Sequence, residues 1–182
     1  MRVDITGVKP GGTFESLLRT VGFVVVQWAH CEQSLELLVN TLFLQFGGSK
    51  LPGRKQMPKP LSGKIAFVKE CAAQISSLAS FKFELEALAS DFEALLQTRH
   101  DLVHGALTDA PVLNGVFTFI RLEAHPDIHE VKEFQYDLKK FPALEASLVR
   151  LGTKAPKVAR RVFAARPNSR IVLARRSPRR RG

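Results

Sequence analysis

Apolar residues recur at alternating intervals of three and four along the first part of the chain, which is the spacing of one face of an α-helix. The pattern predicts a long amphipathic helix that begins at Thr13, as N-cap, and ends at Gly47 and Gly48. Its apolar stripe consists of Phe14, Leu17, Val21, Val24, Trp28, Cys31, Leu35, Leu38 and Leu42.

Two further helices are predicted after an exposed loop. Residues 47–60 contain several prolines, glycines and basic residues among few apolar ones, which is typical of a loop. A second helix is expected over about residues 61–79 and a third over about residues 81–104. Gly105 follows the third helix directly and is expected to end it.

After the third helix the pattern changes to β-branched and aromatic residues. Val116–Glu123 and Ile128–Leu138 are predicted to form a small hairpin, joined by a turn at Ala124–Asp127. The alternative for Lys132–Leu138 is the start of a helix. A short last helix is predicted to end at Gly152, with an apolar stripe of Phe141, Leu144, Leu148 and Leu151.

These elements make one mainly helical domain over residues 1–152, followed by a basic tail over residues 153–182. Eleven of the 27 lysines and arginines lie in the tail and none of the 17 acidic residues does, so the domain is nearly neutral. Prolines interrupt the few apolar residues of the tail, which predicts disorder in the free protein. Its arginines are candidate contacts for the phosphates of RNA or DNA, the alternative being a solvated tail with incidental charge: Arg160, Arg161, Arg175, Arg176, Arg179, Arg180 and Arg181.

Several classes of protein are excluded by what the sequence lacks. The longest apolar run, around Val21–Val26, is far below the roughly 20 residues that cross a bilayer, and the N-terminus has no secretory signal. We therefore expect a cytoplasmic protein with no membrane span. Cys31 and Cys71 are expected to be buried free thiols rather than disulfide or metal ligands. No glycine-rich phosphate loop, nucleophile elbow or Cys-x-x-Cys pair is present, and no cofactor is expected.

A metal site is an alternative raised by two histidine pairs of four-residue spacing, His100 with His104 and His125 with His129. Pro126 interrupts the second pair, and no cysteine or clustered acid completes a ligand set. The sequence therefore predicts no metal.

Arg99 is the residue that least fits a structural role, because continuing the stripe of the third helix from Leu95 places it on the packed face. A guanidinium there costs on the order of several kcal/mol unless a carboxylate, a phosphate or a wet cleft receives its charge. Glu32 on the first helix is the candidate internal partner. His104 lies at the end of the same helix, where the helix dipole favours protonated imidazole, and His100 shares its face.

The segment Arg99-His100-Asp101-Leu102-Val103-His104-Gly105 resembles the signature of the HEPN superfamily: an arginine, about four to six residues of which the first is usually polar, and a histidine. The order of parts is also similar, with Trp28 four residues before Glu32 on a long first helix. The resemblance covers roughly residues 13–152. It implies a HEPN-like helical bundle in which the hairpin is an insertion.

This resemblance implies a metal-independent endoribonuclease in which two chains pair and place both motifs at a shared cleft. The RNA is cut by its own 2′-hydroxyl, which attacks the neighbouring phosphate. His104 is the candidate acid or base and Arg99 the candidate phosphate clamp, supported by His100, Asp101 and Glu32. A toxin or phage-defence setting, with an antitoxin or nucleotidyltransferase as partner, is also implied. The alternative is a non-catalytic HEPN-like dimerisation, nucleic-acid-binding or scaffold module in which Glu32 neutralises Arg99.

Overall fold

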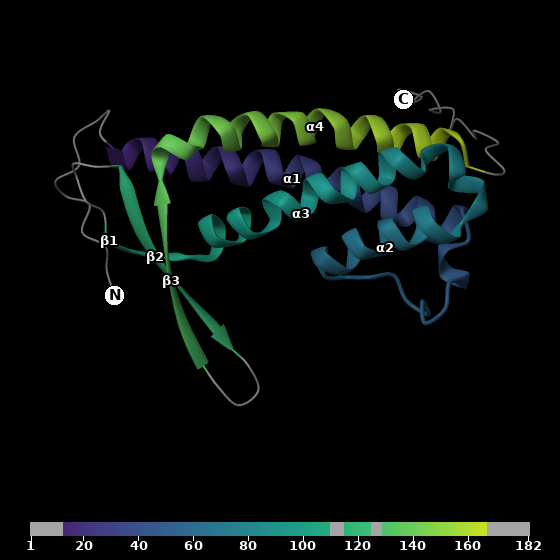
Figure 1. Cartoon of the computed structure of the whole chain (residues 1–182), viewed down its shortest axis with the longest axis horizontal. Coiled ribbons are helices and arrows are strands. Elements are labelled where there is room, and N and C mark those ends of the chain that lie inside the picture. Colours follow the sequence, from purple (N-terminus) through teal and green to yellow (C-terminus); the bar gives the residue numbers. More distant parts are fainter. Residues whose placement is uncertain (1–12, 110–114, 125–128, 167–182) are drawn as a thin grey trace, which may run out of the picture.

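The computed structural model describes residues 13–109, 115–124 and 129–166 (Figure 1). These residues are mainly helical, as the sequence predicts. The α-helices are α1 (Thr13–Gln45), α2 (Leu61–Gln74), α3 (Lys82–His104) and α4 (Phe141–Ala164), and the strands are β1 (Ala106–Asp109), β2 (Val116–Ala124) and β3 (His129–Asp137). Short 3₁₀ helices precede or connect them: η1 (Gly48–Lys50), η2 (Ser76–Phe81) and η3 (Leu138–Lys140).

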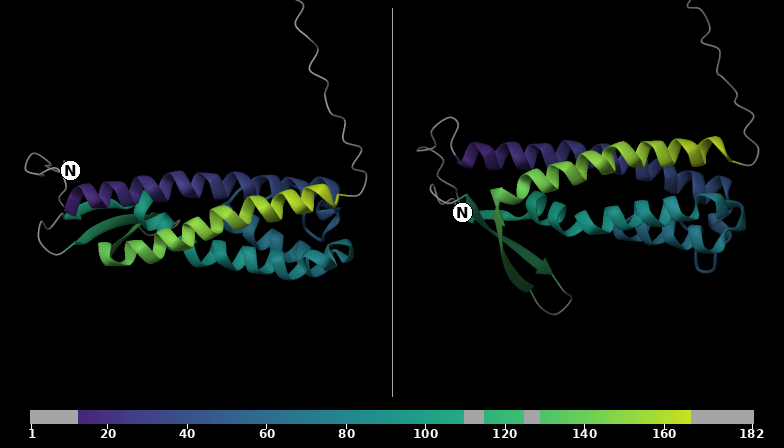
Figure 2. Two further views of the ribbon diagram at one scale, coloured as in Figure 1. Left: turned by 90° about the horizontal axis from the view of Figure 1, so that it is seen from above. Right: turned by 45° about the horizontal axis from the view of Figure 1, so that its top comes forward.

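Helix α1 forms the centre of the core, because its predicted stripe is buried against the other helices. Its most buried apolar side chains, none more than 2% exposed, are Leu17, Val24, Trp28, Cys31, Leu35, Leu38, Val39 and Leu42. Helix α4 runs beside α1 along most of its length, and α3 lies beside α2 (Figures 1 and 2). The Trp28 ring meets Phe92 of α3 edge to face, with ring centroids 5.7 Å apart.

The last helix is longer than predicted. The sequence analysis ends it at Gly152 and assigns residues 153–182 to a disordered tail, whereas α4 continues to Ala164 and carries Pro156 in its interior. The predicted boundary between domain and tail therefore falls inside a helix. Residues 167–182 lie outside the described part of the chain.

Burial explains why α4 passes through a proline. An interior proline costs about 3 kcal/mol, whereas each buried valine-sized side chain contributes about 1.5–3 kcal/mol. Gly152 lets α4 approach α1 closely, since a Cβ there would lie 3.3 Å from Oε1 of Gln27. The residues of α4 that continue the stripe into the core beyond Gly152 are Ala155, Val158, Ala159 and Val162.

The second predicted helix is divided in two. Helix α2 ends at Gln74, where Ile75 adopts an extended conformation, and η2 then buries Leu78 before α3 begins at Lys82. Ser76 and Ser77 follow the break, and serine side chains compete with helical backbone hydrogen bonds. The predicted third helix keeps its end at His104.

The predicted hairpin is confirmed, and Lys132–Leu138 continues it as strand through Asp137 rather than starting an α-helix. β2 and β3 pair antiparallel, with Phe119 opposite Phe134. Strand β1, which the sequence analysis did not predict, pairs with the other edge of β2 and gives the order β1-β2-β3. The paired strands β2 and β3 project away from the helices beyond the end of α3 (Figure 1). Of the predicted turn, residues 125–127 lie outside the described residues.

Both cysteines are buried and free. Burial raises the pKa of Cys31 to about 11 and that of Cys71 to about 12. Within residues 13–166, apart from the two gaps, no helix combines the length and the apolar character that crossing a membrane requires.

Candidate active site

The C-terminal turns of α3 place Arg99 against α1. Its guanidinium carbon lies 5.8 Å from the centroid of the Trp28 ring, and Nη2 lies 3.7 Å from Oε2 of Glu32. The Arg99 side chain is 21% exposed and that of Glu32 38% exposed. The arginine thus lies over the core, as its place in the stripe predicts, while this ion pair stays open to solvent.

Arg99 and His104 are in direct contact. Nη1 of Arg99 lies 3.1 Å from Nε2 of His104. A guanidinium has only donors, so this contact is a hydrogen bond to the lone pair of Nε2 in the tautomer that carries its ring proton on Nδ1. A permanent cation and the lone pair of a titratable ring therefore lie side by side at an exposed helix end.

His100 adds a second imidazole to this cluster. Its ring centroid lies 4.9 Å from that of His104, because residues four apart share a helix face. Desolvation lowers the pKa of His100 below its usual 6.5, and the charge of Arg121 lowers it further. His100 is therefore neutral at physiological pH and can donate or accept a hydrogen bond.

Asp101 lies toward the sheet and not toward Arg99. Its Oδ1 pairs with the guanidinium of Arg121 on β2 and accepts a hydrogen bond from Nε2 of Gln97 at 2.6 Å. The Arg121 and Asp101 side chains are only 13% and 20% exposed. Asp101 therefore joins α3 to the hairpin. Sequence reasoning did not single out Arg121, although an arginine within an apolar strand is the signal for it.

The sequence analysis places Trp28 in the apolar stripe and in the resemblance, and the structure adds that Arg99 lies over its ring. Its ring is 1% exposed. Nε of Arg99 and Nε1 of Trp28 are buried donors for which the described residues provide no acceptor. A ring face and two partly exposed side chains, rather than a sealed carboxylate, therefore surround the guanidinium.

The arginines assigned to the tail lie far from this cluster or outside the described residues. Nη1 of Arg161 donates to Oε1 of Glu84 at 2.6 Å, whereas Arg160 is exposed and lines the same pocket as His30 of α1. Both lie toward the C-terminal end of α4, at the opposite end of the bundle from the end of α3 (Figure 1). The remaining predicted contacts are outside the described residues: Arg175, Arg176, Arg179, Arg180 and Arg181.

The described residues include no group of three or more histidines, cysteines, aspartates or glutamates placed to hold a metal ion. His125 of the second histidine pair lies outside them.

No known protein family, curated protein or solved structure matches this chain. The function of the site therefore has to be inferred from the geometry of its own residues.

Proposed function

We propose that the protein is a HEPN-like, metal-independent endoribonuclease whose catalytic residues are Arg99 and His104. The observation that carries this proposal is the 3.1 Å contact between Nη1 of Arg99 and Nε2 of His104 at an exposed helix end. An isolated histidine there would serve as a helix cap, and an isolated arginine would serve as an ion-pair partner. Together they supply the proton transfer and the positive charge that RNA cleavage requires.

The chemistry follows from the two side chains. Nε2 of His104 accepts the proton of a ribose 2′-hydroxyl, whose oxygen then bonds to the adjacent phosphorus. Arg99 donates to the non-bridging oxygens, where negative charge increases. The bond from phosphorus to the 5′-oxygen breaks, and that oxygen takes a proton from a second imidazole. The products are a 2′,3′-cyclic phosphate and a 5′-hydroxyl.

A second copy of the chain is the proposed source of the second imidazole, which donates the proton to the 5′-oxygen. Leu18, Val25 and Glu32 are each seven residues apart on α1, so they lie along nearly one line of the helix. Leu18 is 56% exposed and Val25 is 45% exposed. This exposed apolar line ends at the glutamate that pairs with Arg99. Two chains that pack along it would bring their clusters close together.

The dimer is tested by placing a charge on this line. We expect Val25→Glu to give monomers in sedimentation experiments and to lose RNA cleavage with its folded helix content intact. Leu44→Glu is the matched control, because Leu44 is 67% exposed on the same helix but near its far end. A monomeric wild type, or equal effects of both variants, would contradict the shared site.

The catalytic assignment is tested in EDTA with mixed RNA substrates. The substitution His104→Ala should lower the rate of RNA cleavage by about 10²–10⁴-fold. Arg99→Ala should lower it by about 10²–10³-fold, as loss of an oxyanion donor does. His30→Ala, which removes an exposed histidine of α1, should leave the rate unchanged. Equal cleavage rates for the wild type and His104→Ala would contradict the proposal.

A second candidate function is a non-catalytic HEPN-like module, which the Arg99–Glu32 pair favours. Under that reading, Glu32→Gln weakens the fold and no variant affects any cleavage. Under the nuclease proposal, Glu32→Gln leaves Arg99 available to the phosphate. The cleavage rate then stays within about tenfold of the wild-type rate.

The proposed setting is a toxin or defence system with an antitoxin or nucleotidyltransferase partner. Expression of the wild type should then arrest cell growth, and expression of His104→Ala should not. Normal growth with active enzyme would separate the cleavage activity from this setting.

The basic C-terminus is proposed to add salt-dependent affinity for RNA. Truncation must follow Arg166, because residues 153–164 belong to α4. We expect a chain ending at Arg166 to bind RNA more weakly at low salt and to show a smaller salt dependence. Unchanged affinity would assign RNA binding to the helical domain alone.

A further inference from the structure

Two adjoining pockets form one groove between α3 and α4. One has a volume of about 460 Å³ and the other, nearer the sheet, about 370 Å³. They share Leu95 of α3 and Ser147 of α4, so the groove is continuous.

Each wall of the groove is one face of a helix. The wall residues of α3 run from Asp91 to Leu102 and those of α4 from Ala143 to Lys154, with spacings of three and four. At a rise of 1.5 Å per residue, each wall is about 17 Å long. This length accommodates about three turns of a partner helix, the usual occupant of a groove with such spacing.

The floor of the groove is apolar and contains one buried polar group. Leu102, Leu144 and Leu151 line it and are at most 8% exposed. Tyr136, which is 7% exposed, also lines it, and its buried hydroxyl has no hydrogen-bond partner among the described residues. Burial raises the pKa of Tyr136 to about 12, so this hydroxyl keeps its proton at neutral pH.

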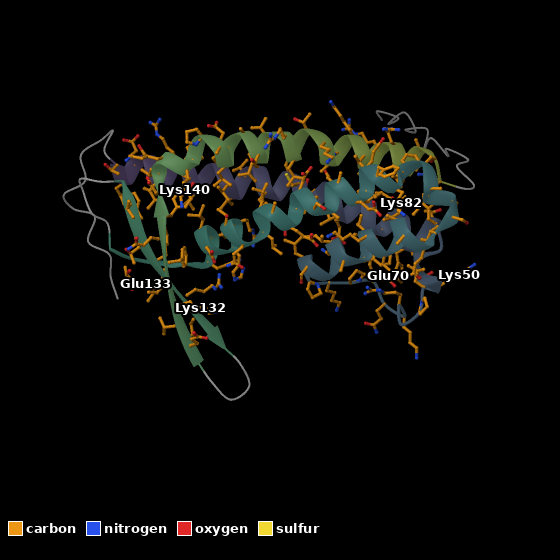
Figure 3. The ribbon with its side chains drawn as sticks, in the orientation of Figure 1. Lys50, Glu70, Lys82, Lys132, Glu133 and Lys140 are labelled. Carbon is orange, nitrogen blue, oxygen red and sulfur yellow. The ribbon has the colours of Figure 1, made fainter. Side chains whose placement is uncertain are left out.

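The charges of the groove leave two cations in excess. Asp91 pairs with Lys154 at 2.6 Å, and Asp101 pairs with Arg121. The Arg150 guanidinium donates to the Ser147 hydroxyl, and Lys140 directly precedes α4 (Figure 3). Within the ranges that the structure describes, neither cation has a carboxylate within ion-pair distance. The groove therefore complements an acidic ligand.

We propose that this groove docks an amphipathic helix of a partner protein, with its apolar side on the floor and acidic residues beside Arg150 and Lys140. Arg99 and His104 are not among the residues that line the groove. The docking proposal goes beyond the proposed ribonuclease function, and its test uses binding alone, so either proposal can fail without the other.

The probe is a fluorescent synthetic helix of about 14 residues, with leucines at helical spacing along one side and glutamates on both flanks. A twin peptide carries lysine at every glutamate position. We expect saturable binding of the glutamate peptide to the full chain at low salt, and weaker or no binding of the lysine twin. Amide NMR shifts should cluster on the groove residues.

Charge-reversal variants distinguish binding in the groove from non-specific electrostatic attraction to the rest of the protein. The double variant Lys140→Glu/Arg150→Glu should weaken binding of the glutamate peptide at least about tenfold. Lys139→Glu/Lys157→Glu makes the same change in net charge at exposed positions outside the groove, and should leave affinity within about twofold. Thermal unfolding verifies that both variants are folded.

The proposal is overturned if the glutamate peptide does not saturate the wild type, or if both double variants weaken binding equally. It is also overturned if the NMR shifts cluster on the exposed line of α1 around Leu18 and Val25, which would assign peptide capture to that surface.

Discussion

A Cβ atom at Gly105 would lie 2.6 Å from Cζ of Phe134 on β3, closer than carbon atoms approach each other without displacement. The same Cβ would lie 2.5 Å from the backbone oxygen of Asp101. The φ of Gly105 is −72°, which every residue type adopts. Glycine is therefore required here for space, because the hairpin packs directly on the end of the helix that carries His104.

Gly105→Ala should consequently lower the free energy of unfolding by about 1–3 kcal/mol, the usual cost of overpacking, and should reduce cleavage by displacing the helix end. Gly22→Ala is the matched control, since its Cβ would meet nothing within 4 Å. It should stabilise α1 by about 0.5–1 kcal/mol. Chemical denaturation followed by Trp28 fluorescence measures both, and a neutral Gly105→Ala would contradict the packing.

The ion pair between Asp101 and Arg121 should be structural. Asp101→Asn and Arg121→Gln should each destabilise the fold, and their double-mutant cycle should give a coupling energy of about 0.5–3 kcal/mol. Cleavage by folded Asp101→Asn should stay within about tenfold of wild type. Full stability with a loss of cleavage as large as that of His104→Ala would instead give Asp101 a catalytic role.

His100 should make the fold sensitive to mild acid. Desolvation lowers the pKa of His100 in the folded state from its usual 6.5, so the unfolded state binds more protons between the two values. The stability that this histidine contributes is present above pH 6.5 and is lost as the pH falls through the folded value. The free energy of unfolding, measured against pH, should depend less steeply on pH in His100→Gln. A slope in His100→Gln equal to that of the wild type would contradict this assignment.

The two thiols should be unreactive in the folded protein. Their pKa values of about 11 and 12, against 9.0 for an ordinary thiol, keep Cys31 and Cys71 protonated at neutral pH. A thiol reagent should modify both at the rate of unfolding. Because the unfolded thiols ionise first, stability should fall as the pH rises above 9.0. Rapid modification of either thiol in the native protein would contradict its burial.

Much of the fold follows from the spacing of apolar residues. The stripes of α1 and α3 predicted those helices because long repeats of three and four are specific to helices. The predicted end of α4 at Gly152 is wrong, because burial of Ala155 and Val158 continues the helix past a glycine and a proline that locally disfavour it. The short strand β1 was not predicted, because its hydrogen bonds come from β2 and leave no periodic pattern in so few residues.

The candidate site could be predicted only as a set of residues. The stripe placed Arg99 on the packed face, and proximity in sequence placed His104 beside it. That Asp101 lies toward Arg121 depends on where the hairpin packs, which spacing does not determine. The support from Trp28 likewise depends on how α3 crosses α1.

The most direct test of the central claim is the chemistry of the RNA ends that the purified wild type produces in EDTA. Attack by the 2′-hydroxyl predicts fragments with 2′,3′-cyclic phosphate and 5′-hydroxyl termini, and no cleavage at a position substituted with 2′-deoxyribose. Fragments with 3′-hydroxyl and 5′-phosphate termini, or intact RNA across varied substrates, would contradict it.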